Sequence, residues 1–187
     1  ANTMVGGMGA DVFILNEQDM LSVNSTNTTA RNFKVFGDKN GVFDTSSYVL
    51  PYTPDSYVDE LRIYAWSNNP SSTSTTVGTA KKLELNKFYT QVDHVEKIDI
   101  SADGVSSLIN LDVGLIQGFA DESNNSRIIL KLKNNSDTYV IDNTGPNGIT
   151  YTSTKTLNGV MANGATSETV TFKQGTTTVG IAYIEYV

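Results

Sequence analysis

The stretch that decides the fold is VGGMGADVFIL, residues Val5–Leu15. Its three glycines, Gly6, Gly7 and Gly9, let the backbone turn tightly and present its carbonyl groups. Asp11 then supplies a hard anionic oxygen, which is the kind of ligand that calcium prefers. Aromatic and aliphatic residues follow in the alternating order of a short strand. The stretch therefore predicts a cation-binding turn that opens a β-strand, and a plain glycine-rich turn before a strand is the alternative.

The order of residues in this stretch resembles a known repeat. Read as Gly-Gly-x-Gly-x-Asp-x-U-x, with Phe13 as the apolar U, it is similar to the nonapeptide that binds calcium in the β-rolls of RTX proteins. The resemblance implies that Asp11 is a calcium ligand and that Phe13 faces inward. Such a site is shared between successive turns, so a single copy is half a site. We expect the partner turn to lie upstream of Ala1, in a longer protein of which this chain is a module.

Composition and charge exclude several function classes. The chain has 187 residues and a formal net charge of −7, which suits one well-cored domain that recruits cations. Nucleic acids and anionic membranes call for basic patches instead. No apolar run approaches the roughly 20 residues that span a bilayer, so we expect no membrane insertion. The chain has no cysteine, so an extracellular version of it needs calcium or another device in place of disulfides.

Alternation of apolar and polar residues predicts many short strands and almost no helix. Leu108–Ile116 is the one plausible helical turn, and the irregular spacing at the start of Val92–Ser101 indicates a bulge. Short strands separated by Gly, Asn and Asp turns favour a β-sandwich. The predicted strands are Val12–Leu15, Asn32–Gly37, Glu60–Trp66, Leu83–Tyr89, Val92–Ser101, Arg127–Leu132, Tyr139–Ile141, Ile149–Thr154, Thr169–Phe172 and Val179–Val187.

The second half of the chain resembles large bacterial RTX adhesins that are exported by type I secretion. The segments that carry the resemblance are VEKIDIS (Val95–Ser101), ADGVSSLINLDVGLI (Ala102–Ile116), RIILKLKNNSDTYVID (Arg127–Asp142), GITYTSTK (Gly148–Lys155) and TTTVGIAYIEYV (Thr176–Val187). With the first 15 residues, the resemblance covers roughly Asp93 to Val187. The chain departs from the family in the weakened acidic turn near Asn134 and in a longer region from Leu157 to Thr169.

The largest departure lies between residues 16 and 92, where the family has only a short connector. We therefore expect a single all-β domain over residues 1–187: a calcium-stabilised β-sandwich with an RTX-like half-repeat at 5–15, a large loop-rich insertion at 16–92 and the rest of the scaffold at 93–187. Loops on a rigid scaffold are where binding surfaces are built, so the insertion is the candidate binding region.

Acidic clusters in glycine- and proline-punctuated loops are the candidate calcium sites. Asp38, Asn40 and Asp44 follow the spacing of the first half of an EF-type loop, without its closing Glu. Asp99 lies between two isoleucines on the polar face of a strand, where a cation or a hydrogen-bonding partner is expected. For each cluster the alternative is a set of solvated loop carboxylates. The candidate metal ligands are Asp11, Asp38, Asn40, Asp44, Asp55, Asp59, Asp99, Asp103 and Asp121.

Aromatic residues interleaved with these acidic loops suit stacking on a sugar or gripping a peptide side chain, although packing within the sheet is the alternative. The candidate ligand-binding residues are Tyr48, Tyr52, Tyr57, Tyr64 and Trp66. His94, the only histidine, is predicted to lie on the polar face of a strand, and no second His or Cys supports a zinc site. No G-x-S-x-G elbow accompanies it. Acidic pairs could in principle serve a glycosidase, but no pair stands out from metal ligation, so we expect no enzyme.

The resemblance implies a calcium-dependent module of a bacterial surface adhesin. It would attach the cell to a host or neighbouring surface by binding a peptide, such as a protein C-terminus, or a glycan through calcium-organised loops. The module is expected to be extracellular and monomeric within its longer chain. The alternative is a non-binding structural cap of the RTX β-roll that nucleates folding after secretion, and the discriminating feature is the insertion, which a cap does not need.

Overall fold

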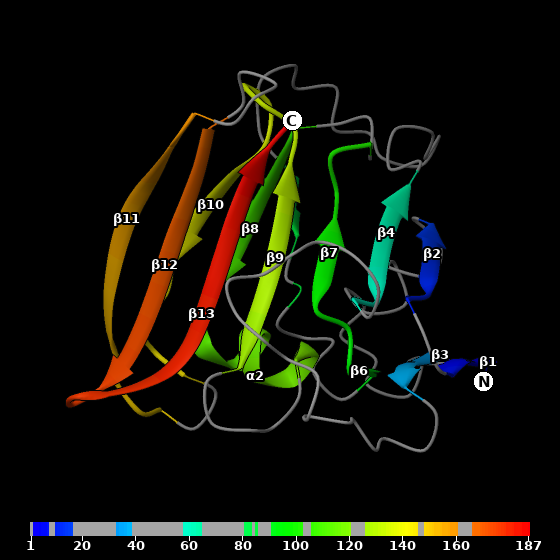
Figure 1. The fold of residues 1–187 in the computed structure, drawn as a ribbon, viewed down its shortest axis with the longest axis horizontal. Coiled ribbons are helices and arrows are strands. Elements are labelled where there is room, and N and C mark those ends of the chain that lie inside the picture. The colour runs from blue at the N-terminus through cyan, green and yellow to red at the C-terminus, as the bar shows by residue number, and fades with distance from the viewer. Residues whose placement is uncertain are drawn as a thin grey trace.

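The computed structural model describes residues 2–7, 10–16, 33–38, 58–64, 81–83, 85, 91–102, 106–120, 126–145, 148–160 and 166–187. These residues form strands and one helix (Figure 1). In chain order the elements are β1 (Asn2–Gly7), β2 (Val12–Asn16), β3 (Phe33–Asp38), β4 (Glu60–Tyr64), β5 (Lys81–Leu83), β6 (Val92–Asp93), β7 (Lys97–Asp99), β8 (Ser107–Leu111), α2 (Val113–Phe119), β9 (Arg127–Leu132), β10 (Thr138–Ile141), β11 (Thr152–Val160), β12 (Thr166–Gln174) and β13 (Thr177–Tyr186).

The chain winds in stacked coils, and each coil gives one strand to each of several sheets. One sheet has the order β1-β3-β6, a second β10-β8-β5, and the third β11-β12-β13-β9-β7-β4-β2. All pairs within the first two sheets, and those from β13 to β2 in the third, are parallel. The first coil therefore holds β1 and β2, the second β3 to β5, the third β6 to β8, and the fourth α2, β9 and β10.

Helix α2 takes the place of a strand in the fourth coil. Asp112 begins it as an N-cap, because its Oδ1 accepts the Leu115 N–H at 2.7 Å. The helix ends beside the corner that follows β6, where the Val95 N–H donates to the Phe119 carbonyl at 2.8 Å. The parallel first sheet thus stops at β6, and the helix covers its last strand.

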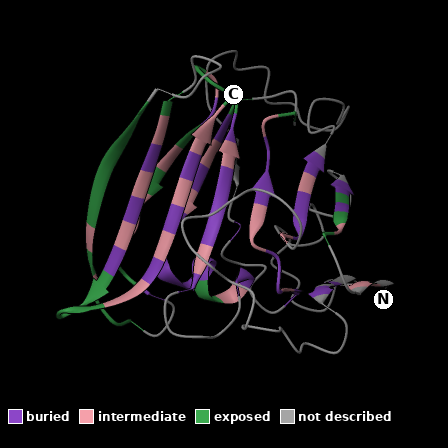
Figure 2. Cartoon of the chain, viewed as in Figure 1, coloured by how far each residue is buried: buried purple, intermediate pink, exposed green. Residues whose placement is uncertain are grey.

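The C-terminal strands end the coiled part differently. β13 joins β9 in parallel, and β12 and β11 then add to it in antiparallel hairpins. Gly175, at φ 62°, makes the turn between β12 and β13 in a backbone conformation that favours glycine. The outer strand β11 is largely exposed along its length (Figure 2), and its pairing with β12 is interrupted between Leu157 and Gly159.

The core is a set of rows that run across the coils. Register places Phe13, Leu61, Ile98, Leu130 and Ile184 side by side on the inward face of the third sheet, and all five are buried. Burying such side chains stabilises the fold by roughly 1.5–3 kcal/mol each. Because side chains alternate across a strand, the neighbouring positions form a second set of rows on the outward face.

The predicted all-β class is confirmed, but the sheets are arranged differently from the expected sandwich. The described strands lie in three sheets with mostly parallel pairs, whereas a sandwich packs two antiparallel sheets face to face. The predicted helical turn at Leu108–Ile116 divides into β8 and the first half of α2. The region predicted as an insertion, residues 16–92, contributes β3, β4 and β5, one strand to each sheet.

Candidate functional site: a stacked corner and its acidic ladder

Three coils turn the same corner, between the first sheet and the third. The pairs Val5–Phe36 and Gly7–Asp38 flank Gly6 and Gly37, and continuing the β3–β6 register by one residue places Gly37 opposite His94. On the far side of the corner, extending the registers of β2, β4 and β7 back by one residue places Asp11 beside Asp59 and Asp59 beside Glu96, as their hydrogen bonds confirm. An acidic side chain thus occupies the same position in each of three successive coils.

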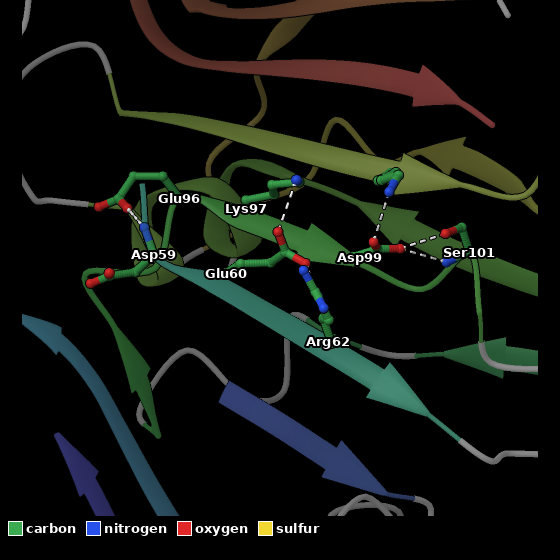
Figure 3. A network of polar contacts seen from close by, with 8 residues as sticks. Asp59, Glu60, Arg62, Glu96, Lys97, Asp99 and Ser101 are labelled. Carbon is green, nitrogen blue, oxygen red and sulfur yellow. Dashed lines mark hydrogen bonds and ion pairs between the residues drawn. The ribbon is translucent and has the colours of Figure 1, made fainter. Parts of the chain in front are cut away.

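These acids link the coils through backbone hydrogen bonds. The Asp59 Oδ1 atom accepts the Asp11 N–H at 2.7 Å. The Glu96 Oε2 atom accepts the Asp59 N–H at 3.0 Å, as Figure 3 shows. The main chain continues the pattern, because the Glu60 N–H donates to the Asp11 carbonyl and the Lys97 N–H to the Asp59 carbonyl. Hydrogen bonds to a charged acceptor are worth about 1.5–3 kcal/mol each, so the ladder stabilises this stack.

Close packing at the corner requires glycine. A Cβ atom on Gly37 would overlap the His94 carbonyl oxygen and the Asp59 Oδ2 atom. A Cβ atom on Gly6 would in the same way overlap the Gly37 carbonyl oxygen and the Asp11 carboxylate. Glycine at these two positions therefore lets each acid fold back against its own coil while the next coil stacks directly on it.

Several predicted calcium ligands meet at this corner. Asp11 and Asp59 are neighbours in the ladder. Asp38, the last residue of β3, pairs with Gly7, the last residue of β1, where the two strands enter the corner. The remaining predicted ligands Asn40, Asp44, Asp55, Asp103 and Asp121 lie outside the described residues. Within the part of the chain that the structure describes, no group of three or more His, Cys, Asp or Glu side chains is placed to hold a metal ion.

The outward face of the third sheet carries a second set of charges. Glu60 accepts a hydrogen bond from Arg62 on its own strand and pairs with the Lys97 Nζ atom at 2.8 Å (Figure 3). Burial alone would raise the pKa of Glu60, but the donors of Arg62 and Lys97 outweigh it and hold the pKa below its ordinary value. This carboxylate is therefore ionised and paired across the strands at neutral pH.

Asp99, a predicted calcium ligand, belongs to that outward face. Its Oδ2 atom pairs with the Lys131 Nζ atom at 3.0 Å, and its Oδ1 atom accepts the Ser101 hydroxyl at 2.6 Å. Burial acts to raise the pKa of Asp99, yet hydrogen bonds from Ser101 and Lys131 lower it overall. Both oxygens thus have protein donors, and a calcium ion at this position would have to displace the lysine.

Of the candidate ligand-binding aromatics, the structure describes Tyr64. Tyr48, Tyr52, Tyr57 and Trp66 lie outside the described residues. Tyr64 is the last residue of β4. Register places it beside Asn16 of β2, where both strands end, away from the stacked corner at which they begin.

His94 differs from the prediction. Instead of lying on the polar face of a strand it sits in the corner between β6 and β7, with φ 55° and only 7% of its surface exposed. Its Nδ1 atom lies 3.0 Å from the Asp93 Oδ1 atom. The spacing that indicated a bulge at the start of Val92–Ser101 is this change of direction between two sheets.

The sequence analysis does not predict a polar cluster that is centred on β12, in the antiparallel part of the third sheet. Glu168 of β12 is buried, accepts the Tyr139 hydroxyl at 2.6 Å, and pairs with the Lys155 Nζ atom at 2.8 Å. Burial acts to raise the pKa of Glu168, but Lys155 and Tyr139 lower it overall, while burial and the Glu168 charge raise the pKa of Tyr186 to about 12. A signal was present, because Glu168 falls on the same face of its strand as Val170 and Phe172.

Comparison with known proteins identifies no relative: no protein-family model, curated protein or solved structure matches this chain. Among the described residues, no helix is long and apolar enough to cross a membrane.

Proposed function

We propose that the chain is a calcium-dependent ligand-binding module of a bacterial surface adhesin. In this proposal the stacked coils form a rigid frame, and a long excursion from the second coil carries the binding residues. The ligand is a peptide, such as a protein C-terminus, or a glycan on another cell surface. The proposal rests on the sequence resemblance to RTX adhesins and on one feature of the coils.

That feature is the unequal length of the same corner in three coils. Between the equivalent residues Gly6 and Asp11 the chain has residues 7–10, and between His94 and Glu96 it has Val95 alone. In the second coil, residues 38–58 separate Gly37 from Asp59. The ladder is maintained in all three coils, so the extra chain of the second coil is not needed to build the frame, and loops held by a frame commonly carry function.

The excursion concentrates the residues that this function needs. It contains Asp38, Asn40, Asp44 and Asp55, and it ends at Asp59, so five of the predicted calcium ligands lie on one continuous segment or at its end. Three of the predicted aromatic residues, Tyr48, Tyr52 and Tyr57, lie on the same segment. A calcium ion held by such oxygens with one open position can bind a carboxylate or a pair of hydroxyl groups directly.

Deletion of residues 38–57 tests the proposal with little disturbance of the frame. It leaves the sequence Gly37–Val58–Asp59, which matches His94–Val95–Glu96 of the third coil residue for residue. The shortened chain is expected to fold, and to lose both the rise in melting temperature on adding calcium and binding to a peptide and glycan array in calcium. A matched control replaces residues 38–57 with a Gly/Ser segment of equal length. Unchanged calcium response and unchanged array binding in the deletion variant would refute the proposal.

A structural cap is the second candidate function, and the antiparallel strands β11 to β13 favour it. They follow the last parallel pair, β13 with β9, and end the third sheet with a different pairing. A cap acts through folding alone. If the deletion variant lost no measurable binding because the parent chain bound nothing on the array, while removal of β11 abolished folding, the cap would be the better assignment.

A further inference from the structure

The first coil presents two strand edges that are paired on one side only. β1 pairs with β3, and β2 pairs with β4 over all five of its residues. No other described strand pairs with either of them. Within the described part of the chain, the backbone N–H and C=O groups of their opposite edges pair with no other strand.

The acidic ladder is incomplete at the same edge. Asp59 and Glu96 each accept the backbone N–H of the ladder acid one coil before. Asp11 is the first acid of the ladder. Its Oδ2 atom lies against Gly6 as the Asp59 Oδ2 atom lies against Gly37, so the Asp11 Oδ1 atom holds the place from which Asp59 accepts an N–H. No described strand pairs with the first coil on that side to supply such an N–H. One more coil, placed by the same translation, would bring a backbone N–H to this carboxylate.

The two ends of the third sheet are protected differently. At one end the edge strand β11 carries Lys155 and an irregularity between Leu157 and Gly159, which are devices that discourage pairing with another strand. At the other end the sequence of β2 is VFILN, without a charge, and Val12 and Ile14 are 49% and 58% exposed. β1 is also uncharged. The β11 edge thus carries two features that discourage pairing, and the described strands of the first coil carry neither of them.

We propose that the edge of the first coil is a docking surface for a further coil of the same construction: two parallel strands joined at a corner, with a backbone N–H directed at the Asp11 carboxylate. The stack also defines the incoming sequence. Gly6 and Gly37 are glycines because a Cβ would overlap the carbonyl oxygen of the next coil. The incoming coil therefore needs glycine at the position that stacks on Gly6.

A tandem duplication tests this in the full chain. Residues 2–32 are repeated ahead of residue 2, so that the added copy supplies strands like β1 and β2 together with a connection of native sequence. We expect a rise in melting temperature of roughly 5 °C and at least about tenfold slower hydrogen exchange of the original β1 and β2 amides. Both measurements are made in chelator, which separates the result from calcium binding and from the proposed function.

Two matched controls make the result specific. In the first, the added copy carries Gly6→Val, whose Cβ would collide with the carbonyl of the original Gly6. In the second, the original Asp11 is changed to Ala. Each control is expected to lose most of the gain. No gain from the duplication, or an equal gain in both controls, would overturn the proposal. So would a concentration-dependent dimer of the unextended chain that protects the same amides, because that result assigns the edge to a second copy.

Discussion

Gly37→Ala is expected to be strongly destabilising, although it adds a single methyl group. The new Cβ would overlap the His94 carbonyl oxygen and the Asp59 Oδ2 atom. The His94 carbonyl oxygen belongs to the main chain and cannot rotate away as the end of a flexible side chain can. The strand of the third coil that ends beside His94 must therefore move by more than about 1 Å to restore ordinary contact. That strand is β6, and its neighbour β3 is held to it by the Val35 N–H, which donates to the Gln91 carbonyl at 2.7 Å.

The magnitude follows from these two effects. Overpacking a tight site costs about 1–3 kcal/mol, and the loss of one backbone hydrogen bond costs about 1 kcal/mol. A total of about 3 kcal/mol corresponds to a fall in melting temperature of roughly 6–12 °C for a chain of this size. Thermal unfolding followed by circular dichroism measures the fall, and hydrogen exchange at the Val35 amide reports whether β3 and β6 have separated.

Gly175→Ala is the matched control. Gly175 has φ 62° and no neighbour within 4 Å of a built Cβ, so alanine there meets backbone strain but no collision. The expected cost is about 1–2 kcal/mol. If Gly37→Ala destabilises no more than Gly175→Ala, the direct stacking of Gly37 on the third coil is refuted, and with it the ladder that depends on that spacing.

Two further predictions concern pH. The pKa of Asp99 is lowered on folding, so its pairing with Lys131 stabilises the protein at pH values above the unfolded pKa of about 4. This stabilisation is lost as the pH falls through the folded pKa. Asp99→Asn should therefore reduce, by about 1 kcal/mol, the loss of unfolding free energy that the wild-type chain shows on acidification. The pKa of Tyr186 is raised to about 12, so its contribution is complete below pH 10 and is lost towards pH 12. Glu168→Gln should cost about 1–3 kcal/mol at pH 7 and bring tyrosinate absorbance at 295 nm to lower pH; no change in that titration would contradict the cluster.

The strands could be predicted from the sequence because the core repeats every second residue. Glu60, Leu61, Arg62 and Ile63 alternate between the outward and inward faces of β4 as their polarity indicates. The same alternation serves a sandwich and a stack of parallel coils, so it could not distinguish the two. Which strands pair depends on the connections between them. Residues 38–58 are so long a connection that the sequence does not show that Gly37 and Asp59 occupy the same positions as Gly6 and Asp11.

The acidic ladder was only partly accessible to sequence reasoning. Asp11 and Asp59 are both predicted as oxygen ligands, but they lie 48 positions apart and nothing in their local sequence indicates that they are neighbours. Glu96 stands in VEKIDIS, where it has the pattern of one more polar residue of an alternating strand. Glu168 is the opposite case, because the alternation of β12 places it on the same face as Val170 and Phe172.

Under the proposed function, stability and binding have separate locations in the chain. The ladder needs only the residues at the two sides of the corner, Gly37 and Asp59 in the second coil, and it accepts one residue between them in the third coil as readily as residues 38–58 in the second. Loop-closure entropy costs about 0.6 kcal/mol for each doubling of length, so lengthening the connection from one residue to residues 38–58 costs roughly 2.6 kcal/mol, and deleting the extra residues recovers that cost. A substitution of one methyl group at Gly37 should therefore harm folding more than removal of the whole segment 38–57. That ordering distinguishes a stack of coils from a sandwich, in which long loops and corner glycines have no such fixed relation.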